Sequence, residues 1–202
     1  MHRELSTHLE VPVSPTLSQD RAGTRSRPVT LQDSAQVCID VIQFGDYQCL
    51  DCGKAAVTLS AFRRQYAKQV RFIYRHFPQA FMHPLAAQAA EAAECARAQG
   101  RFWQMHELLM SNQHRLELRD LCDYADRAGL DQRRFDIEMD EETHLSVVQG
   151  HISSAVAHHV RGTPSYVVDG LLIDTTNGLQ PLFQAAEHAI IQQRRYFVTP
   201  HY

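Results

Sequence analysis

Two cysteines that stand three positions apart, Cys49 and Cys52, are the residues best suited to chemistry in this chain. An apolar, β-branched run precedes them, and a stretch with helical spacing of apolar residues begins directly after Cys49. Free backbone N–H groups and the helix dipole at such a start favour a thiolate. The pattern therefore indicates thiol–disulfide exchange, with Cys49 as the exposed nucleophile and Cys52, one turn further in, as the buried resolving thiol.

A Cys-x-x-Cys pair has other interpretations, namely half of a zinc site or an incidental pair. A structural zinc ion takes about four ligands. The remaining cysteines, Cys38, Cys95 and Cys122, occur singly at apolar or helical positions, so we expect them to be buried and unreactive and we expect no metal site. An odd total of five cysteines also argues against a fully paired secreted framework.

The composition is that of an ordinary globular protein of 202 residues with a net charge of −3, which gives no reason to expect a nucleic-acid or anionic-membrane partner. No window approaches 18 uninterrupted apolar residues, and the first ten residues lack the apolar core of a signal peptide. We therefore expect a cytoplasmic protein, or a periplasmic one if the true start lies upstream. In the cytoplasm a Cys-x-x-Cys pair is more often catalytic or metal-binding than structural.

The elements that position the cysteines form a β–α–β unit. Residues 37–44 are typical of a buried strand, 50–68 of a helix and 70–75 of a second strand, which predicts parallel strands and a right-handed crossover. Residues 1–35 are predicted to be a lead-in with one short strand near 9–13.

Strand signals then disappear between residues 84 and 159, where an all-α insertion is expected. Its predicted helices cover residues 85–99, 102–112, 117–128, 131–140 and 142–159. Strands return at 165–168 and 171–173 around the turn pair Asp169-Gly170, and a helix over 179–195 follows. The prediction is an α/β domain made of residues 36–83 and 160–196, interrupted by the insertion.

Gly162-Thr163-Pro164 lies just before the strand at 165–168. A proline at the head of a strand can hold a cis peptide bond, although base rates favour a trans proline that opens an edge strand. A cis bond would leave the backbone groups of Thr163 free to pair with an extended substrate.

Three segments resemble the DsbA-like thioredoxin-fold oxidoreductases. Residues 44–53 (Phe-Gly-Asp-Tyr-Gln-Cys-Leu-Asp-Cys-Gly) resemble the active-site segment of that family, 83–106 resemble its first inserted helices, and 160–170 resemble its cis-proline loop and hairpin. The resemblance runs from about residue 28 to 190. It implies a thioredoxin fold with a helical insertion, Cys49 as nucleophile, Cys52 as resolving thiol, and a cis Pro164 that faces the disulfide, with Gly162 and Thr163 beside it as substrate-binding residues.

Two departures from the family pattern concern residues that would support the reaction. Gln43 stands near a position where the family commonly carries an acid, and an amide cannot take the proton of the resolving thiol. Asp46 is close in sequence, but a turn-forming role is the simpler interpretation. Between the cysteines, Leu50 and Asp51 replace the Pro and the His, Tyr or Phe of many members, and the charge of Asp51 disfavours a neighbouring thiolate.

The sequence thus predicts a thiol–disulfide oxidoreductase that is a weak oxidant or a reductase rather than a strong disulfide donor. It would need no bound cofactor, because its redox centre is the cysteine pair itself. The expected partners are protein or small-molecule thiols and disulfides, with glutathione or a thioredoxin-type system for turnover. A metal-binding or other non-redox module and a glutathione-linked isomerase or transferase remain alternatives.

Overall fold

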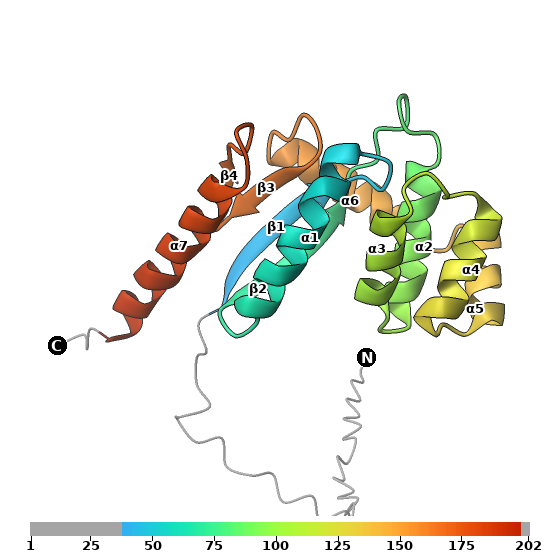
Figure 1. The fold of residues 1–202 in the computed structure, drawn as a ribbon, viewed down its shortest axis with the longest axis horizontal. Helices are drawn as coiled ribbons and strands as arrows, with labels where there is room; N and C mark the ends of the chain where they lie inside the picture. Colours follow the sequence, from blue (N-terminus) through green and yellow to red (C-terminus); the bar gives the residue numbers. More distant parts are fainter. Residues whose placement is uncertain (1–37, 199–202) are drawn as a thin grey trace, which may run out of the picture. The chain divides into compact units, whose positions relative to one another are not determined.

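A four-stranded mixed sheet forms the centre of the computed structural model, which describes residues 38–198 and the side chains up to residue 193 (Figure 1). The lead-in and the strand predicted near 9–13 lie outside the described residues. The strands are β1 (Ile39–Gly45), β2 (Val70–His76), β3 (Ser165–Val168) and β4 (Leu171–Ile173), in the order β2-β1-β3-β4. β1 is parallel to β2, while the β1–β3 and β3–β4 pairs are antiparallel.

The predicted β–α–β unit and hairpin are both confirmed. Helix α1 (Leu50–Gln65) connects the parallel strands β1 and β2, and it ends three residues earlier than predicted. Asp169 and Gly170 connect β3 to β4 with φ angles of 49° and 81°. Both angles lie in the left-handed region, which a two-residue hairpin turn of the primed type requires.

Alternation along β1 divides the core between the two faces of the sheet. Ile39 and Val41 belong to a buried cluster with α1 and α7 (Gln180–Val198), whereas Phe44 packs with Ala155 of α6 on the opposite face. Successive side chains of a strand point to opposite faces. The sheet is therefore covered on both sides, which explains the continuous apolar character of the segment that precedes the cysteines.

The insertion is helical, as predicted. Its helices are α2 (Ala86–Ala98), α3 (Phe102–Ser111), α4 (Leu118–Ala128), α5 (Gln132–Asp140) and α6 (Leu145–Ala157). The last of these begins three residues later than predicted, because residues 141–144 form a turn in which Glu142 has a φ of 49°. The division of the chain into lead-in, main domain and insertion stays a prediction, since secondary structure alone does not define domains.

The core of the insertion continues into the end of the sheet that carries the cysteines. One buried cluster joins Tyr47, Cys52 and Tyr74 to apolar side chains of α2, α3, α4 and α5. The insertion therefore packs against the segment that holds the two thiols.

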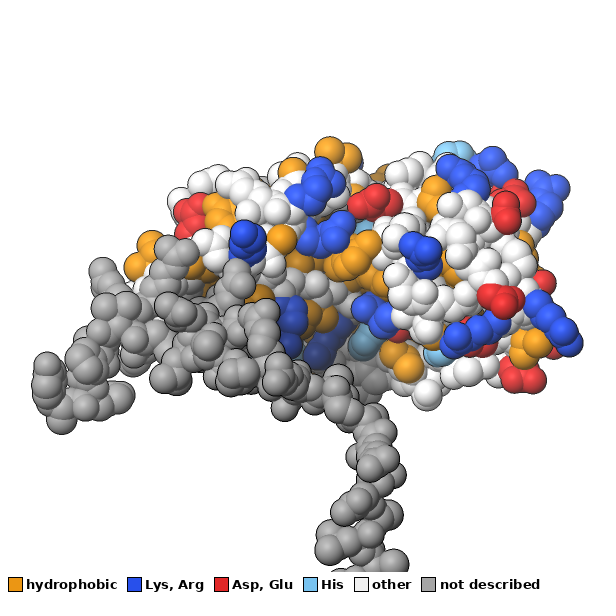
Figure 2. Space-filling view, turned by 90° about the horizontal axis from the view of Figure 1, so that it is seen from below, with side chains coloured by type: hydrophobic (Ala, Val, Ile, Leu, Met, Phe, Trp, Pro, Cys, Tyr) orange, Lys and Arg blue, Asp and Glu red, His pale blue; other side chains and the backbone are white. Residues whose placement is uncertain are grey.

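On the face seen in Figure 2, acidic and basic side chains are interspersed over the helical part of the molecule. Among residues 38–198, no helix combines the length and the apolar character that crossing a membrane requires.

Candidate active site

Cys49 occupies the N-cap of α1, as the sequence predicted. Its backbone is extended, with φ −74° and ψ 115°, and its side chain provides no capping hydrogen bond. Because β1 and β3 are antiparallel, the segment after β1 lies beside the segment before β3. This pairing brings the Cys49 thiol to the Thr163 carbonyl, to which it donates a hydrogen bond of 3.2 Å. The Thr163–Pro164 peptide bond is cis, as the family resemblance implies.

The environments of the two thiols push their pKa values in opposite directions. The hydrogen bond from the Cys52 thiol is the largest influence on the pKa of Cys49 and lowers it. Burial raises this pKa, whereas a hydrogen bond with the Thr163 side chain and bonds from the backbone N–H groups of Cys52 and Asp51 lower it, and the net result is a pKa of about 5. The pKa of Cys52 is raised by the hydrogen bond that it donates to Cys49, by its burial, and by the nearby negative charge. At neutral pH one sulfur is a thiolate and the other a protonated thiol.

The exposed fractions of the two cysteines differ less than predicted. Cys52 is 0% exposed, in agreement with a buried resolving position, but Cys49 is itself only 9% exposed. Cys49 lies in the core cluster where the insertion meets the sheet.

Leu50 and Asp51 both point to solvent, with Leu50 71% exposed. Asp51 Oδ1 forms an ion pair of 2.7 Å with Lys54 Nζ, one turn further along α1. By itself, the charge of Asp51 would disfavour a neighbouring thiolate. The structure adds a neighbouring cation that offsets this charge beside Cys49, and the pKa of Lys54 is raised chiefly by Asp51 and also by Cys49.

Asp46 is buried, and its carboxylate makes more contacts than a turn-former needs. It accepts hydrogen bonds from the backbone N–H of Gln48 (2.7 Å) and of Gln79 (2.8 Å), and its Oδ2 lies 2.7 Å from Nδ1 of His83. The first contact fixes the turn before Cys49, and the other two attach that turn to the loop between β2 and α2. Asp46 therefore stabilises the position of the active-site turn.

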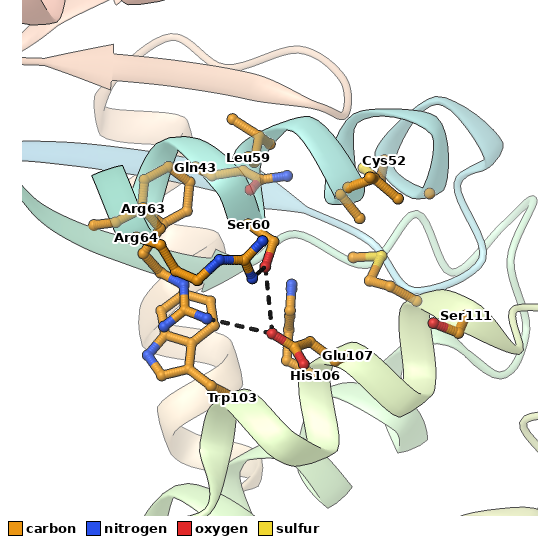
Figure 3. Close-up of a pocket in the computed structure, with 15 residues that line it drawn as sticks. Gln43, Cys52, Leu59, Ser60, Arg63, Arg64, Trp103, His106, Glu107 and Ser111 are labelled. Carbon is orange, nitrogen blue, oxygen red and sulfur yellow. Dashed lines mark hydrogen bonds and ion pairs between the residues drawn. The ribbon is translucent and has the colours of Figure 1, made fainter. Parts of the chain in front are cut away.

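Gln43 is buried in the wall of a cavity of about 360 Å³ between α1 and α3 (Figure 3). Cys52 lines the same cavity, with Trp103 and Arg63 also in its wall. The Arg63 guanidinium lies 4.1 Å from the centre of the Trp103 ring and 3.3 Å from Glu107. The structure thus brings Gln43, predicted from the sequence as a supporting residue, into the same cavity as Cys52.

A second, more open groove of about 920 Å³ lies on the Pro164 side of α1. Gly162, Thr163 and Pro164 line it together with Asp51 and Lys54. The Gly162 carbonyl accepts a hydrogen bond of 2.8 Å from the Ser165 hydroxyl, which holds the loop against the start of β3.

Gln113, in the loop after α3, was missed by the sequence analysis. Its side-chain amide donates to the carbonyl oxygens of Tyr47 (3.1 Å) and Cys49 (2.7 Å) and so attaches the insertion to the active-site turn. A Cβ atom at Gly53 would overlap this amide, which explains the glycine directly after Cys52. The glycine at position 53, inside a helix, was the available signal in the sequence. The side chain that excludes a larger residue there, Gln113, lies 60 positions further along the chain.

Several proteins named Na(+)/H(+) antiporter NhaA are similar in sequence to this chain. The protein from Salinispora tropica is 36% identical over 162 residues, which cover 80% of this chain and 23% of the antiporter. The protein from Herminiimonas arsenicoxydans is 31% identical over 83% of this chain and 25% of its own length. The chain thus spans about a quarter of the length of these curated relatives.

Two solved structures with the same fold illustrate the similarity. A thioredoxin-like oxidoreductase from Silicibacter pomeroyi is 25% identical, with a TM-score of 0.64 over 78% of this chain and 87% of that one. BdbD from Bacillus subtilis has a TM-score of 0.67 at 20% identity, over 79% and 90% of the two chains. A family model described as thioredoxin matches residues 33–186. The chain therefore belongs to the thioredoxin family and has the fold of the DsbA-like thiol–disulfide oxidoreductases.

Proposed function

We propose that this chain catalyses thiol–disulfide exchange, with Cys49 as the nucleophile and Cys52 as the resolving thiol. The observation that carries the proposal is the division of protonation between the two sulfurs, since the pKa of Cys49 is lowered and that of Cys52 is raised. A thiolate is the attacking species in exchange, and a protonated neighbour does not compete with it.

The reaction needs only these sulfurs and the substrate. The Cys49 thiolate attacks a substrate disulfide, forming a mixed disulfide and releasing one substrate thiolate. Cys52 then loses its proton and attacks the Cys49 sulfur, which releases the second substrate thiolate and leaves the Cys49–Cys52 disulfide. The substrate gains two electrons and the enzyme loses them, and the reverse sequence oxidises a dithiol. We propose that no bound cofactor takes part.

We further propose that an extended peptide or a small disulfide binds in the groove beside Pro164. The groove is lined by backbone of Gly162 and Thr163 and by exposed polar side chains, which suits a substrate recognised largely through its main chain. Protein or small-molecule thiols are therefore the proposed partners, with glutathione or a thioredoxin-type system for regeneration. Ion transport is not part of the proposal, because the chain covers only about a quarter of the antiporters that it matches.

The reduction potential follows from the pKa of Cys49. A pKa of about 5 lies between the values of about 7 for thioredoxin and 3.5 for DsbA, whose potentials are about −270 and −120 mV. Each pKa unit of thiolate stabilisation below ambient pH corresponds to about 30 mV for a two-electron couple. The expected potential is therefore roughly −210 to −165 mV, that of a weaker oxidant than DsbA.

To measure the reduction potential, the purified chain is equilibrated in graded glutathione buffers and its free thiols are counted. Insulin reduction and peptide oxidation are assayed in parallel. Cys49→Ala is expected to abolish both activities, and Cys52→Ala to trap mixed disulfides with substrate. Full activity of Cys52→Ala would instead favour a glutathione-linked isomerase or transferase. Stoichiometric zinc that is lost from the Cys49→Ala variant would favour a metal-binding module.

A further inference from the structure

A second group of metal-ligating side chains lies inside the helical insertion, apart from the Cys49–Cys52 pair. Cys95 of α2, Glu138 of α5 and His144, directly before α6, each offer one ligand atom, and these atoms lie within 4.8 Å of one another. Cys95 is 0% exposed and Glu138 9% exposed, and the side chain of His144 is 17% exposed. Three ligand atoms from three segments therefore lie close together in a mostly buried place, which is open to solvent only beside His144.

The contacts within this group point the donors towards one another. Nε2 of His144 lies 3.1 Å from Oε2 of Glu138, and the Cys95 sulfur lies within 4.8 Å of a ligand atom of each of these two residues. Glu91, one turn before Cys95 on α2, accepts a hydrogen bond of 3.2 Å from the backbone N–H of His144. This bond fixes the segment that carries the imidazole and places a second carboxylate close to the group.

We propose that Cys95, Glu138 and His144 bind one Zn²⁺ ion. One sulfur, one imidazole nitrogen and one carboxylate oxygen form a donor set that suits this ion. Zinc bonds of about 2.0–2.3 Å in a tetrahedron place such ligand atoms about 3.3–3.6 Å apart. The His144–Glu138 separation of 3.1 Å is already close to this range, and the sulfur, which lies within 4.8 Å of the other ligand atoms, needs to approach them by at most about 1.2–1.5 Å.

Binding would replace the present hydrogen bonds by metal bonds. The Cys95 thiol loses its proton to solvent and becomes a thiolate ligand. Oε2 of Glu138 moves from His144 to the ion, while Oε1 keeps its 2.6 Å bond to Nε of Arg134. A water molecule or the Glu91 carboxylate takes the fourth position. The ion would join α2, α5 and the start of α6, and so stabilise the insertion.

The ligand atoms of a second cluster, His76, Glu94 and His151, also lie within 4.8 Å of one another, but this cluster is less suited to a cation. Arg97 Nε contacts both oxygens of Glu94, at 3.1 and 2.8 Å, and Nε2 of His76 lies 2.7 Å from one of them. Neither oxygen is free for a metal, whereas Arg134 contacts only one oxygen of Glu138.

The experiment measures Zn²⁺ binding to the reduced full chain after treatment with a chelator. Calorimetric titration with zinc sulfate is combined with Co²⁺ substitution, because a sulfur-to-cobalt charge-transfer band reports a thiolate ligand. Cys95→Ser and His144→Gln test the site. Three matched variants are Cys49→Ser/Cys52→Ser, which removes the redox pair, Cys122→Ser, a cysteine on the neighbouring helix, and His151→Gln in the second cluster.

One zinc per chain is expected in the wild type and in all three matched variants, with a charge-transfer band in each. Cys95→Ser and His144→Gln should each weaken binding by at least tenfold, and Cys95→Ser should abolish the band. Circular dichroism identifies a variant that fails to fold, and the result for His144→Gln, at the partly exposed side of the site, then decides. The proposal is overturned if the chain binds no zinc, if both site variants bind it normally, or if binding is lost with the redox pair or with His151→Gln.

Discussion

Replacing Cys52, the proposed resolving thiol, tests how the structure stabilises the Cys49 thiolate. The hydrogen bond from Cys52 is the largest influence that lowers the pKa of Cys49. Cys52→Ala removes this donor, whereas Cys52→Ser keeps a hydroxyl at the same place. The alanine variant should therefore raise the pKa of Cys49, and the serine variant should leave it close to the wild-type value.

The magnitude follows from the strength of one hydrogen bond to a charged group. Such a bond is worth about 1.5–3 kcal/mol, and one pKa unit corresponds to about 1.36 kcal/mol. The loss amounts to roughly one to two units, so the pKa of Cys49 should rise from about 5 to between about 6 and 7 in Cys52→Ala. The remaining support from Thr163 and the backbone N–H groups keeps it below the ordinary value of a thiol.

The assay follows thiolate absorbance in the ultraviolet and the rate of iodoacetamide alkylation as functions of pH. Both are measured in a Cys38→Ser/Cys122→Ser background. The prediction that these two cysteines are buried was wrong, since Cys38 is exposed and Cys122 half-buried, so both would react with the reagent. Cys95 is retained, because burial and nearby carboxylates raise its pKa to about 12 and keep it protonated over the titration.

Two results would contradict the reasoning. If Cys52→Ala titrates like the wild type, the hydrogen bond between the thiols does not stabilise the thiolate. If the pKa of Cys49 rises as far in Cys52→Ser as in Cys52→Ala, the effect comes from repacking around a buried side chain rather than from the lost hydrogen-bond donor.

Three further predictions concern the surroundings of Cys49. Gln113→Ala should lower the free energy of unfolding by about 1–3 kcal/mol in urea denaturation, because it removes the bond to the Cys49 carbonyl. Gly53→Ala should displace the same amide but cost about 1 kcal/mol less, because alanine is favoured over glycine in a helix, and the double variant should be less than additive. The pKa of Cys49 is depressed on folding, so its contribution to the stability of the reduced form is complete above the unfolded value of about 8.5 and is lost as pH falls through about 5. Denaturation of both forms across this range should show the stability of the reduced protein fall, relative to that of the oxidised protein, towards acid pH. Lys54→Gln should raise the pKa of Cys49, because it leaves the charge of Asp51 unbalanced, while Asp51→Asn should lower it; alkylation rates measure both.

Each of these predictions has a control and a contrary outcome. Gly150→Ala, at a helical glycine with open space around it, should be neutral or stabilising in the urea experiment. A stability difference that does not change with pH would mean that Cys49 titrates near its ordinary pKa. Identical titration of Cys49 in Asp51→Asn and the wild type would refute the electrostatic role given to Asp51.

Local sequence patterns determined most of the fold. Alternation and β-branching located β1 and β2, helical spacing located the five inserted helices to within three residues, and Asp169-Gly170 located the hairpin. These signals are local, because the period of the apolar residues follows the period of the backbone. The position of Cys49 at the start of a helix was predictable for the same reason. The strand, the two cysteines and the helix lie within 30 residues, which leaves few possible arrangements.

Only the tertiary structure decided how the thiols are held. The pairing of β1 with β3 brings the Thr163 carbonyl to Cys49, and the insertion brings Gln113 to the Cys49 carbonyl, across 114 and 64 positions of sequence. The carboxylate of Asp46 attaches the active-site turn to His83 in the same way. The sequence alone identified Cys49 and Cys52 as the reactive residues, because two cysteines at this spacing suit thiol–disulfide exchange. Their pKa values depend on burial and on donors from distant segments, which no local pattern contains.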